Sequence, residues 1–280
     1  MMPTLIVGGE PLSIKIIERM NRRYLTPYYW DIYGMNKANL EDYEAKITKI
    51  KPQEINGDEE FISKPSKIIF TIPLEEDYGR FNETLEAVSK ILKYASNRKI
   101  KLTIGIYQQN RGMEKVIKEL CKVLEEYGNR NGVIMYLGEV YGENMNLGLI
   151  FKILEILKED CMNIQLPLNP EERRNYTYID DAVRALINAN EREEELNIYS
   201  VKGANVNTKT LIKRITELLG IYEVCEIQFN GAIEAISPPN FTQPEWFKPK
   251  INLIDGLNRT IGWFESEYGP IYVLPNNNRK

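Results

Sequence analysis

The groups that can move protons in this chain are tyrosines, lysines, carboxylates and cysteines, because its 280 residues include no histidine. Histidine is the commonest general base and metal ligand, so Ser-His-Asp triads and HExxH zinc sites are excluded and no metal site is expected. The three cysteines, Cys121, Cys161 and Cys225, are far apart in the sequence and odd in number. This pattern indicates neither a disulfide framework nor a CxxC metal site, and it favours a reducing, cytoplasmic compartment.

A glycine-rich turn near the N-terminus is the first candidate binding site. Gly8 and Gly9 follow a short apolar run and precede a helical pattern. Glycine lets a backbone approach a pyrophosphate, and a helix N-terminus attracts an anion. Asp31, about 22 residues beyond Gly9 at the end of the next expected strand, is placed to bind a ribose hydroxyl, which favours NAD over NADP. The plainer interpretation is a simple strand-to-helix turn.

Strand patterns alternate with helical ones along the chain. Apolar runs predict strands over 4–7, 27–32, 67–71, 100–107, 132–137, 176–179 and 196–201. Helical spacing predicts helices over 12–20, 39–49, 81–94, 113–127, 147–158, 182–189, 208–219 and 253–264. Such alternation predicts an α/β fold with a doubly wound, Rossmann-like parallel sheet. We expect a dinucleotide-binding domain over 1–140 and a smaller substrate-binding lobe over 141–280, with about 176–203 returning to the sheet.

The composition excludes several classes of protein. A formal net charge of -4, from 36 basic and 40 acidic residues, argues against a general nucleic-acid binder. No apolar stretch is long enough to suggest a membrane span, and the N-terminal residues show no signal-peptide pattern. The expected partner is therefore a small molecule.

Six segments, in the right order, resemble the extended short-chain dehydrogenase/reductase family, the NAD-dependent epimerases and dehydratases of nucleotide sugars. The segments are LIVGGEPLSI (5–14), MEKVIKEL (113–120), YLGEVYG (136–142), RNYTYIDDAVRAL (174–186), LNIYSVKG (196–203) and KPKINLIDGLNRTIGW (248–263). The resemblance implies a bound NAD, a nucleotide-linked sugar as substrate and a homodimer formed through helices 81–94 and 113–127.

At the cofactor site the resemblance retains some residues and replaces others. Gly8 and Gly9 match the family's TGGxGFIG, whereas Pro11 and Ile14 stand where it has its later glycines. Asp58 resembles the acidic residue of the family's G-D-x-x-D segment near the adenine.

The family's YxxxK motif, whose lysine lowers the pKa of a proton-shuttling tyrosine, falls on Arg111 and Lys115. Arginine cannot shuttle a proton. Tyr107, four residues before Arg111, is the displaced candidate that would pair with Lys115; otherwise Lys115 is an ordinary charged helix residue and Arg111 starts the helix or binds phosphate.

On the substrate side, the R-x-x-N-V-Y-G segment places Glu139 and Tyr141, and Arg173 and Arg174 are candidates for a diphosphate because arginine makes bidentate phosphate contacts. Asp180 and Asp181 are expected to begin and cap a helix rather than to act as paired catalytic carboxylates.

Three functions remain open from the sequence. The first is an NAD-dependent enzyme acting on a nucleotide-linked sugar by hydride transfer with a displaced base. The second is a catalytically silent protein of this fold that binds a nucleotide or a protein partner. The third is non-redox chemistry in a remodelled pocket.

Overall fold

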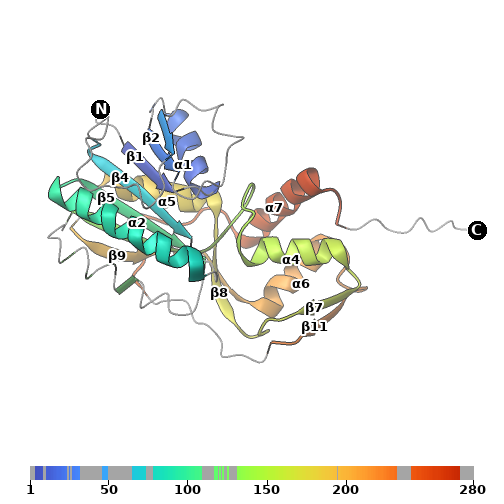
Figure 1. Cartoon of the computed structure of the whole chain (residues 1–280). Coiled ribbons are helices and arrows are strands. Elements are labelled where there is room, and N and C mark those ends of the chain that lie inside the picture. The colour runs from blue at the N-terminus through green and yellow to red at the C-terminus, as the bar shows by residue number, and fades with distance from the viewer. Residues whose placement is uncertain are drawn as a thin grey trace, which may run out of the picture.

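Parallel strands flanked by helices form the centre of the molecule (Figure 1). The computed structural model describes residues 4–8, 11–23, 25, 27–31, 46–49, 65–73, 78–108, 117–118, 120, 122, 125, 131–193, 195–231 and 241–271. Its strands are β1 (Thr4–Gly8), β2 (Tyr28–Asp31), β3 (Lys46–Lys49), β4 (Lys67–Pro73), β5 (Lys101–Tyr107), β6 (Gly132–Tyr141), β7 (Asn163–Leu166), β8 (Arg173–Tyr178), β9 (Asn197–Ser200), β10 (Ala204–Asn207) and β11 (Glu226–Phe229). Its helices are α1 (Pro11–Asn21), α2 (Tyr78–Asn97), α4 (Gly148–Glu159), α5 (Ile179–Glu191), α6 (Thr208–Leu218) and α7 (Leu253–Tyr268).

The large sheet has the order β3-β2-β1-β4-β5-β6-β8-β10, with β9 also paired to β6. Every pairing in it is parallel except that of β8 with β10. The order reverses direction at β1, whose two neighbours are β2 and β4. Ligands of doubly wound sheets bind beyond the carboxyl ends of the strands at such a reversal. The predicted fold class is thus confirmed, and the sheet itself designates one edge for binding.

The two faces of the sheet carry separate hydrophobic clusters. The first cluster joins α1 and α5 to the helices of the C-terminal half and includes Ile6, Leu12 and Leu186. The second lies under α2 and includes Leu92 and Ile104. These side chains are 0% exposed, and full burial of a Leu or Ile side chain contributes roughly 1.5–3 kcal/mol. Because both faces are covered, the strands are continuous apolar runs, which is why the sequence predicts them well.

Strand β6 changes partners along its length. Its first half, Val133 to Tyr136, pairs with β9, and its second half, from Glu139, pairs with β8. The change occurs at Gly138, which has φ +73 and lies next to a register shift against β5. A Cβ atom at Gly138 would overlap the carbonyl oxygen of Asn175, so this position favours glycine on both counts. The bulge places Glu139 opposite Tyr176 of β8.

One predicted helix is wrong in its described part. Lys46–Lys49, the end of the helix expected over 39–49, is strand β3 and pairs in parallel with β2. The sequence KITK contains two β-branched residues, which favour the extended backbone, and edge pairing outweighed a weak helical pattern. The rest of the predicted helix lies outside the described residues.

Two strands that the sequence analysis did not predict form a small second sheet. Strands β7 and β11 pair in parallel, with Asn163 opposite Glu226. This pairing brings Cys225 against Cys161, and the thiol of Cys225 donates to the carbonyl oxygen of Cys161. Burial, followed by the proximity of Cys161, raises the pKa of the Cys225 thiol. Cys161 and Cys225 are therefore neighbours in the fold, although 64 positions separate them in the sequence.

Within the segment expected to return to the sheet, β9 pairs with β6 and α5 packs against α1, β5 and β6. The chain continues from α5 and β9 through β10, α6 and α7, which with α4 and the small sheet lie beyond β8 (Figure 1). The division near residue 140 falls at the end of β6 and stays a prediction.

Candidate functional site

The carboxyl ends of β1 and β2 lie side by side at the edge where the sheet reverses direction. Gly8 and Asp31 are register partners on these adjacent parallel strands. Asp31 thus lies at the end of its strand, as expected, and the cofactor-binding role of both residues stays a prediction. Gly9 and Asp58, the other two expected cofactor residues, lie outside the described residues.

The first turn of α1 is anchored to β1 and β4 by hydroxyl groups. Pro11 begins the helix, where the missing N–H costs no helical hydrogen bond. Ser13 Oγ lies 2.6 Å from Thr71 Oγ1, and Thr71 Oγ1 donates to the carbonyl oxygen of Val7 at 3.3 Å. Ile14 is half-buried and packs against the first cluster. Side-chain packing and buried hydroxyl groups therefore hold the start of α1, at the positions where the family's TGGxGFIG motif has its later glycines.

The end of β5 contributes Tyr107 and Gln108. Tyr107 is 0% exposed and belongs to the first cluster, on the α1 and α5 face of the sheet. Ile117 and Leu120, the nearest buried residues described after Lys115, belong to the second cluster on the other face. The described side chains thus give no support to a Tyr107–Lys115 contact. Lys115 and Arg111 themselves lie outside the described residues, and the catalytic role of all three stays a prediction.

Gln108 is a candidate site residue that the sequence analysis did not name. It is 4% exposed, has φ 65, and its backbone N–H donates to the carbonyl oxygen of Gly138 at 2.9 Å. Its Nε2 atom donates to the carbonyl oxygen of Val140 at 3.4 Å, and among the described residues its Oε1 atom has no partner. Gly148 leaves it room, since a Cβ there would lie 2.6 Å from Nε2. The available signal was a polar residue placed directly after a buried strand.

Glu139 and Arg174, two predicted substrate residues, are brought together as partners of one another. The Arg174 guanidinium is hydrogen-bonded to the Glu139 carboxylate and lies 2.6 Å from that of Glu172. The three side chains are 11%, 4% and 9% exposed. Burial alone would lower the pKa of Arg174, but the two carboxylates outweigh it and hold that pKa above its ordinary value. We call Glu139, Arg174 and Glu172 the buried ionic cluster; its formal charge is -1.

Arg173 and Arg174 do not converge on one point. Adjacent residues of a strand point to opposite sides, and Arg173 is exposed while the Arg174 side chain is 11% exposed. The Arg173 Nε atom donates to Asn205 Oδ1 on β10 at 2.9 Å. The described geometry therefore does not assemble the joint diphosphate clamp expected from the sequence.

Tyr141 lies in an aromatic group between β6 and α7. Its ring meets those of Tyr176 and Tyr178 edge-on, with centroids 6.5 and 5.6 Å away. A side chain at Gly256 of α7 would overlap its hydroxyl, so the glycine makes room for the ring. Burial, followed by Asp181 and Asp255, raises the pKa of Tyr141. Tyr141 is therefore a neutral side chain at neutral pH and could position a ligand through its hydroxyl.

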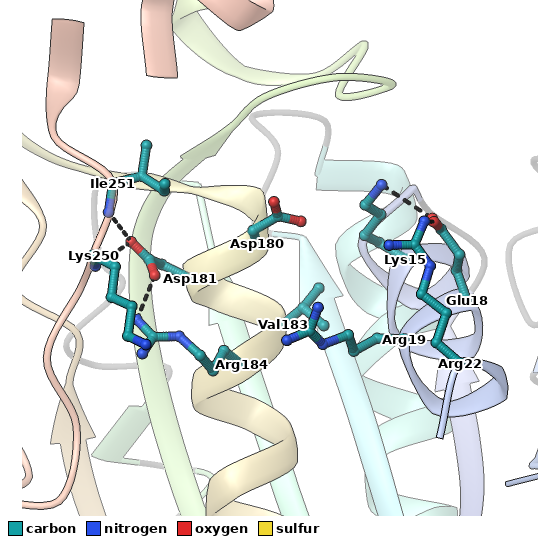
Figure 2. Close-up of a pocket in the computed structure, with 10 residues that line it drawn as sticks. All are labelled: Lys15, Glu18, Arg19, Arg22, Asp180, Asp181, Val183, Arg184, Lys250 and Ile251. Carbon is teal, nitrogen blue, oxygen red and sulfur yellow. Dashed lines mark hydrogen bonds and ion pairs between the residues drawn. The ribbon is translucent and has the colours of Figure 1, made fainter. Parts of the chain in front are cut away.

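A groove lies between the solvent-facing sides of α1 and α5 (Figure 2). Its volume is about 180 Å³. Asp181 forms one wall: its Oδ2 atom accepts from the backbone N–H groups of Lys250 and Ile251 at 2.8 and 2.9 Å, and its Oδ1 atom binds Arg184 at 2.5 Å. Asp181 is thus structural, as expected, although it fastens the 250–251 segment to α5 instead of capping the helix.

Among the described residues, no group of three or more Cys, Asp or Glu side chains is arranged to hold a metal ion. Over the same part of the chain, no helix is long and apolar enough to cross a membrane.

Sequence comparison finds no relatives: no protein-family model matches the chain, and no curated protein matches it. Structure comparison does. The dTDP-glucose 4,6-dehydratase of Bacillus anthracis in complex with NAD superposes with a TM-score of 0.74 at 13% identity, over 96% of this chain and 100% of the other.

Two further solved structures are similar. The UDP-glucose 4-epimerase of Thermotoga maritima with UDP-glucose gives a TM-score of 0.73 at 15% identity, over 94% and 99% of the two chains. The Bordetella bronchiseptica enzyme WbmH in complex with NAD+ gives 0.72 at 18% identity, over 96% and 100%. At these identities the likeness establishes the fold: the chain has the fold of the extended short-chain dehydrogenases/reductases, as its six segments predicted.

Proposed function

We propose that this protein binds NAD and acts as an epimerase or dehydratase on a nucleotide-linked sugar. The observation that carries the proposal is the register pairing of Gly8 with Asp31 at the carboxyl edge of the sheet, beside the reversal of strand order. The superposed structures add support, because proteins crystallised with NAD and with UDP-glucose share this fold over nearly their whole length.

In this proposal Gly8 and Gly9 let the backbone approach the cofactor's pyrophosphate at the start of α1. Pro11 has no N–H, so the donors at this helix start are the backbone groups that follow it. Asp31 accepts from a ribose hydroxyl, which selects NAD over NADP, and Asp58 lies near the adenine. NAD supplies the hydride acceptor, and this chain's residues orient the substrate.

Proton transfer falls to the end of β5 and the segment after it. Tyr107 is the proposed proton-transfer group, with Lys115 and Arg111 as the proposed cations of the segment that follows it, and Gln108 offers a buried amide oxygen to a substrate hydroxyl. Glu139, Tyr141, Arg173 and Arg174 are the proposed substrate-side residues. Because Arg174 is already held by two carboxylates, we assign it to positioning Glu139, not to direct phosphate binding.

Calorimetric titration with NAD+ and NADP+ tests the cofactor. We expect NAD+ to bind more tightly, and Asp31→Ala to weaken NAD+ about tenfold, the loss of a hydrogen bond to a charged group. Glu159→Ala is a control that removes an equal charge from an exposed residue at the end of α4. Absence of binding at millimolar NAD+ and NADP+ would contradict the proposal.

Turnover tests the chemistry. With UDP-glucose and bound NAD, we expect epimerised or dehydrated product by chromatography, and a large loss of kcat in Tyr107→Phe with unchanged NAD+ affinity. Unchanged turnover in this variant would exclude Tyr107 as the proton-transfer group while leaving the cofactor proposal intact.

The protein is further proposed to be a cytoplasmic homodimer associating through α2 and the helix expected over 113–127. Sedimentation of a monomer at micromolar concentration would contradict the dimer.

A further inference from the structure

The groove between α1 and α5 concentrates positive charge on a protein whose net charge is negative. Five cationic side chains line it: Lys15, Arg19, Arg22, Arg184 and Lys250. Three carboxylates accompany them, from Glu18, Asp180 and Asp181. Five minus three leaves a formal charge of +2 in the groove, against -4 for the whole chain. A concave surface of one sign attracts ligands of the other.

Two of the carboxylates are already committed to other partners. Glu18 pairs with Lys15 at 3.0 Å and with Arg22. Asp181 pairs with Arg184 and accepts from two backbone N–H groups. Neither carboxylate is therefore available to neutralise a further cation.

Arg19 and Lys250 are the two lining cations outside these ion pairs. In the part of the chain that the structure describes, no ion pair joins either side chain to a carboxylate. Both residues are exposed. Arg19 extends from α1 toward α5 beside Val183, whereas Lys250 lies with Arg184 on the other side of α5 (Figure 2). The two cations thus lie on opposite sides of α5.

Arg184 is held in place before any ligand arrives. Besides its pair with Asp181, it donates to the carbonyl oxygen of Lys248 at 2.8 Å and stacks over the ring of Phe247 at 4.7 Å. A fixed guanidinium loses less rotamer freedom on binding than a mobile one. Arginine is also the side chain best suited to planar, bidentate contact with phosphate.

The size of the groove limits its ligand. Sites for drug-sized molecules occupy roughly 300–1,000 Å³, and this groove holds about 180 Å³. The space suits a group smaller than a nucleotide. Because the cations lie on two sides of α5, we expect an anion with linked phosphate groups to contact more of them than a single orthophosphate does.

We propose that this groove is a second binding site, separate from the cofactor edge of the sheet, for an anion with two or more linked phosphate groups, held by Arg19, Arg184 and Lys250. Free pyrophosphate and the phosphate chain of a small metabolite present the same chemistry of recognition.

Calorimetric titration of the full chain with sodium pyrophosphate, tripolyphosphate and orthophosphate at low ionic strength tests the site. We expect pyrophosphate and tripolyphosphate to bind more tightly than orthophosphate, and added salt to weaken all three. Arg19→Ala/Lys250→Ala should weaken pyrophosphate about tenfold or more. Lys152→Ala/Lys209→Ala is the matched control, since it removes two exposed lysines elsewhere and should leave affinity unchanged.

Four outcomes would overturn the proposal: no pyrophosphate binding, equal binding by orthophosphate, unchanged affinity in the groove variant, or equal loss in the control. Repeating the titration with saturating NAD+ separates this site from the cofactor site. Independent binding is expected, and competition would place the phosphate at the start of α1 instead. If NAD+ does not bind at all, the groove titration still decides this proposal, since it does not depend on the cofactor.

Discussion

The buried ionic cluster and the groove between α1 and α5 are built from the same kinds of side chain, yet they differ in burial and in sign. The cluster holds two carboxylates and one arginine, each at most 11% exposed, with a formal charge of -1. The groove holds five cations and three carboxylates with a formal charge of +2, and Arg19 and Lys250, the two cations outside its ion pairs, are exposed.

This difference indicates which charged side chains stabilise the fold and which can bind ligands. Breaking a buried ion pair leaves a charge without water or a partner, whereas a surface cation is solvated in any case. Charges in the cluster should therefore determine stability, and charges in the groove should determine binding.

The largest effect is expected for Arg174→Met. This change leaves Glu139 and Glu172 buried without their cation and should lower the free energy of unfolding by about 3–5 kcal/mol, measured by urea denaturation at neutral pH. Arg173→Met is the neighbouring control, and because Arg173 is exposed it should cost about 1 kcal/mol or less.

A triple variant, Arg174→Met/Glu139→Gln/Glu172→Gln, sharpens this test because it removes the charges together. It should regain part of the stability lost in Arg174→Met. If Arg174→Met costs no more than Arg173→Met, the cluster is not the structural element described here.

The next effect is expected for Gly138→Ala. The added methyl group would overlap the carbonyl oxygen of Asn175 at a residue with φ +73, so we expect a loss of about 1–3 kcal/mol. Gly220→Ala is a matched control: it has φ +70 with no neighbour within 4 Å of the added atom, and so isolates the backbone strain. Equal losses in both variants would show that the crowding at Asn175 contributes nothing.

The sequence predicted the scaffold better than the site, for a physical reason. Buried strands such as β4 and β5 are apolar runs whose character is local, and the ends of parallel strands meet at one edge, so Gly8 and Asp31 could be placed together. The helix predicted over 39–49 was wrong at Lys46–Lys49, because the pairing of β3 with β2, a long-range contact, outweighed the local preference.

The charged contacts could not be predicted in this way. Arg174 and Glu139 are 35 residues apart, and nothing in either segment indicates that one neutralises the other. The groove likewise joins Arg19 to Arg184 and Lys250, which approach only after α1 and α5 pack on the same face. Gln108 could not be predicted because glutamine transfers no proton and its burial follows only from the fold.

A smaller, pH-dependent effect is expected from Tyr136, which is 0% exposed beside the cluster. Burial, followed by the charge of Glu139, raises its pKa above the ordinary value of 10.0. The stability that this pKa difference contributes is fully present below pH 10. It is lost as the pH rises from 10 toward the pKa of Tyr136 in the folded state. Each such pH unit costs at most about 1.4 kcal/mol.

Tyr136→Phe should therefore flatten the loss of stability above pH 10 in urea denaturation. At neutral pH it should change stability by about 1 kcal/mol or less, because among the described residues the Tyr136 hydroxyl has no hydrogen-bond partner. Tyr222→Phe, an exposed control, should not change the alkaline profile. If the pH dependence of stability is unchanged in Tyr136→Phe, the burial of Tyr136 beside the cluster does not affect stability at alkaline pH.

The smallest effect on stability is expected in the groove. Arg19→Ala/Lys250→Ala removes two exposed side chains that pair with no described carboxylate, so the free energy of unfolding should change by about 0.5 kcal/mol or less at low salt. Because the variant relieves repulsion among five nearby cations, we expect a slight increase in the free energy of unfolding. The comparison predicts opposite behaviour for the two regions: Arg174→Met costs stability, whereas the groove variant loses pyrophosphate affinity at nearly constant stability. A groove variant that unfolds as readily as Arg174→Met would mean that these cations hold α1 to α5, and the division between charge for folding and charge for binding would fail.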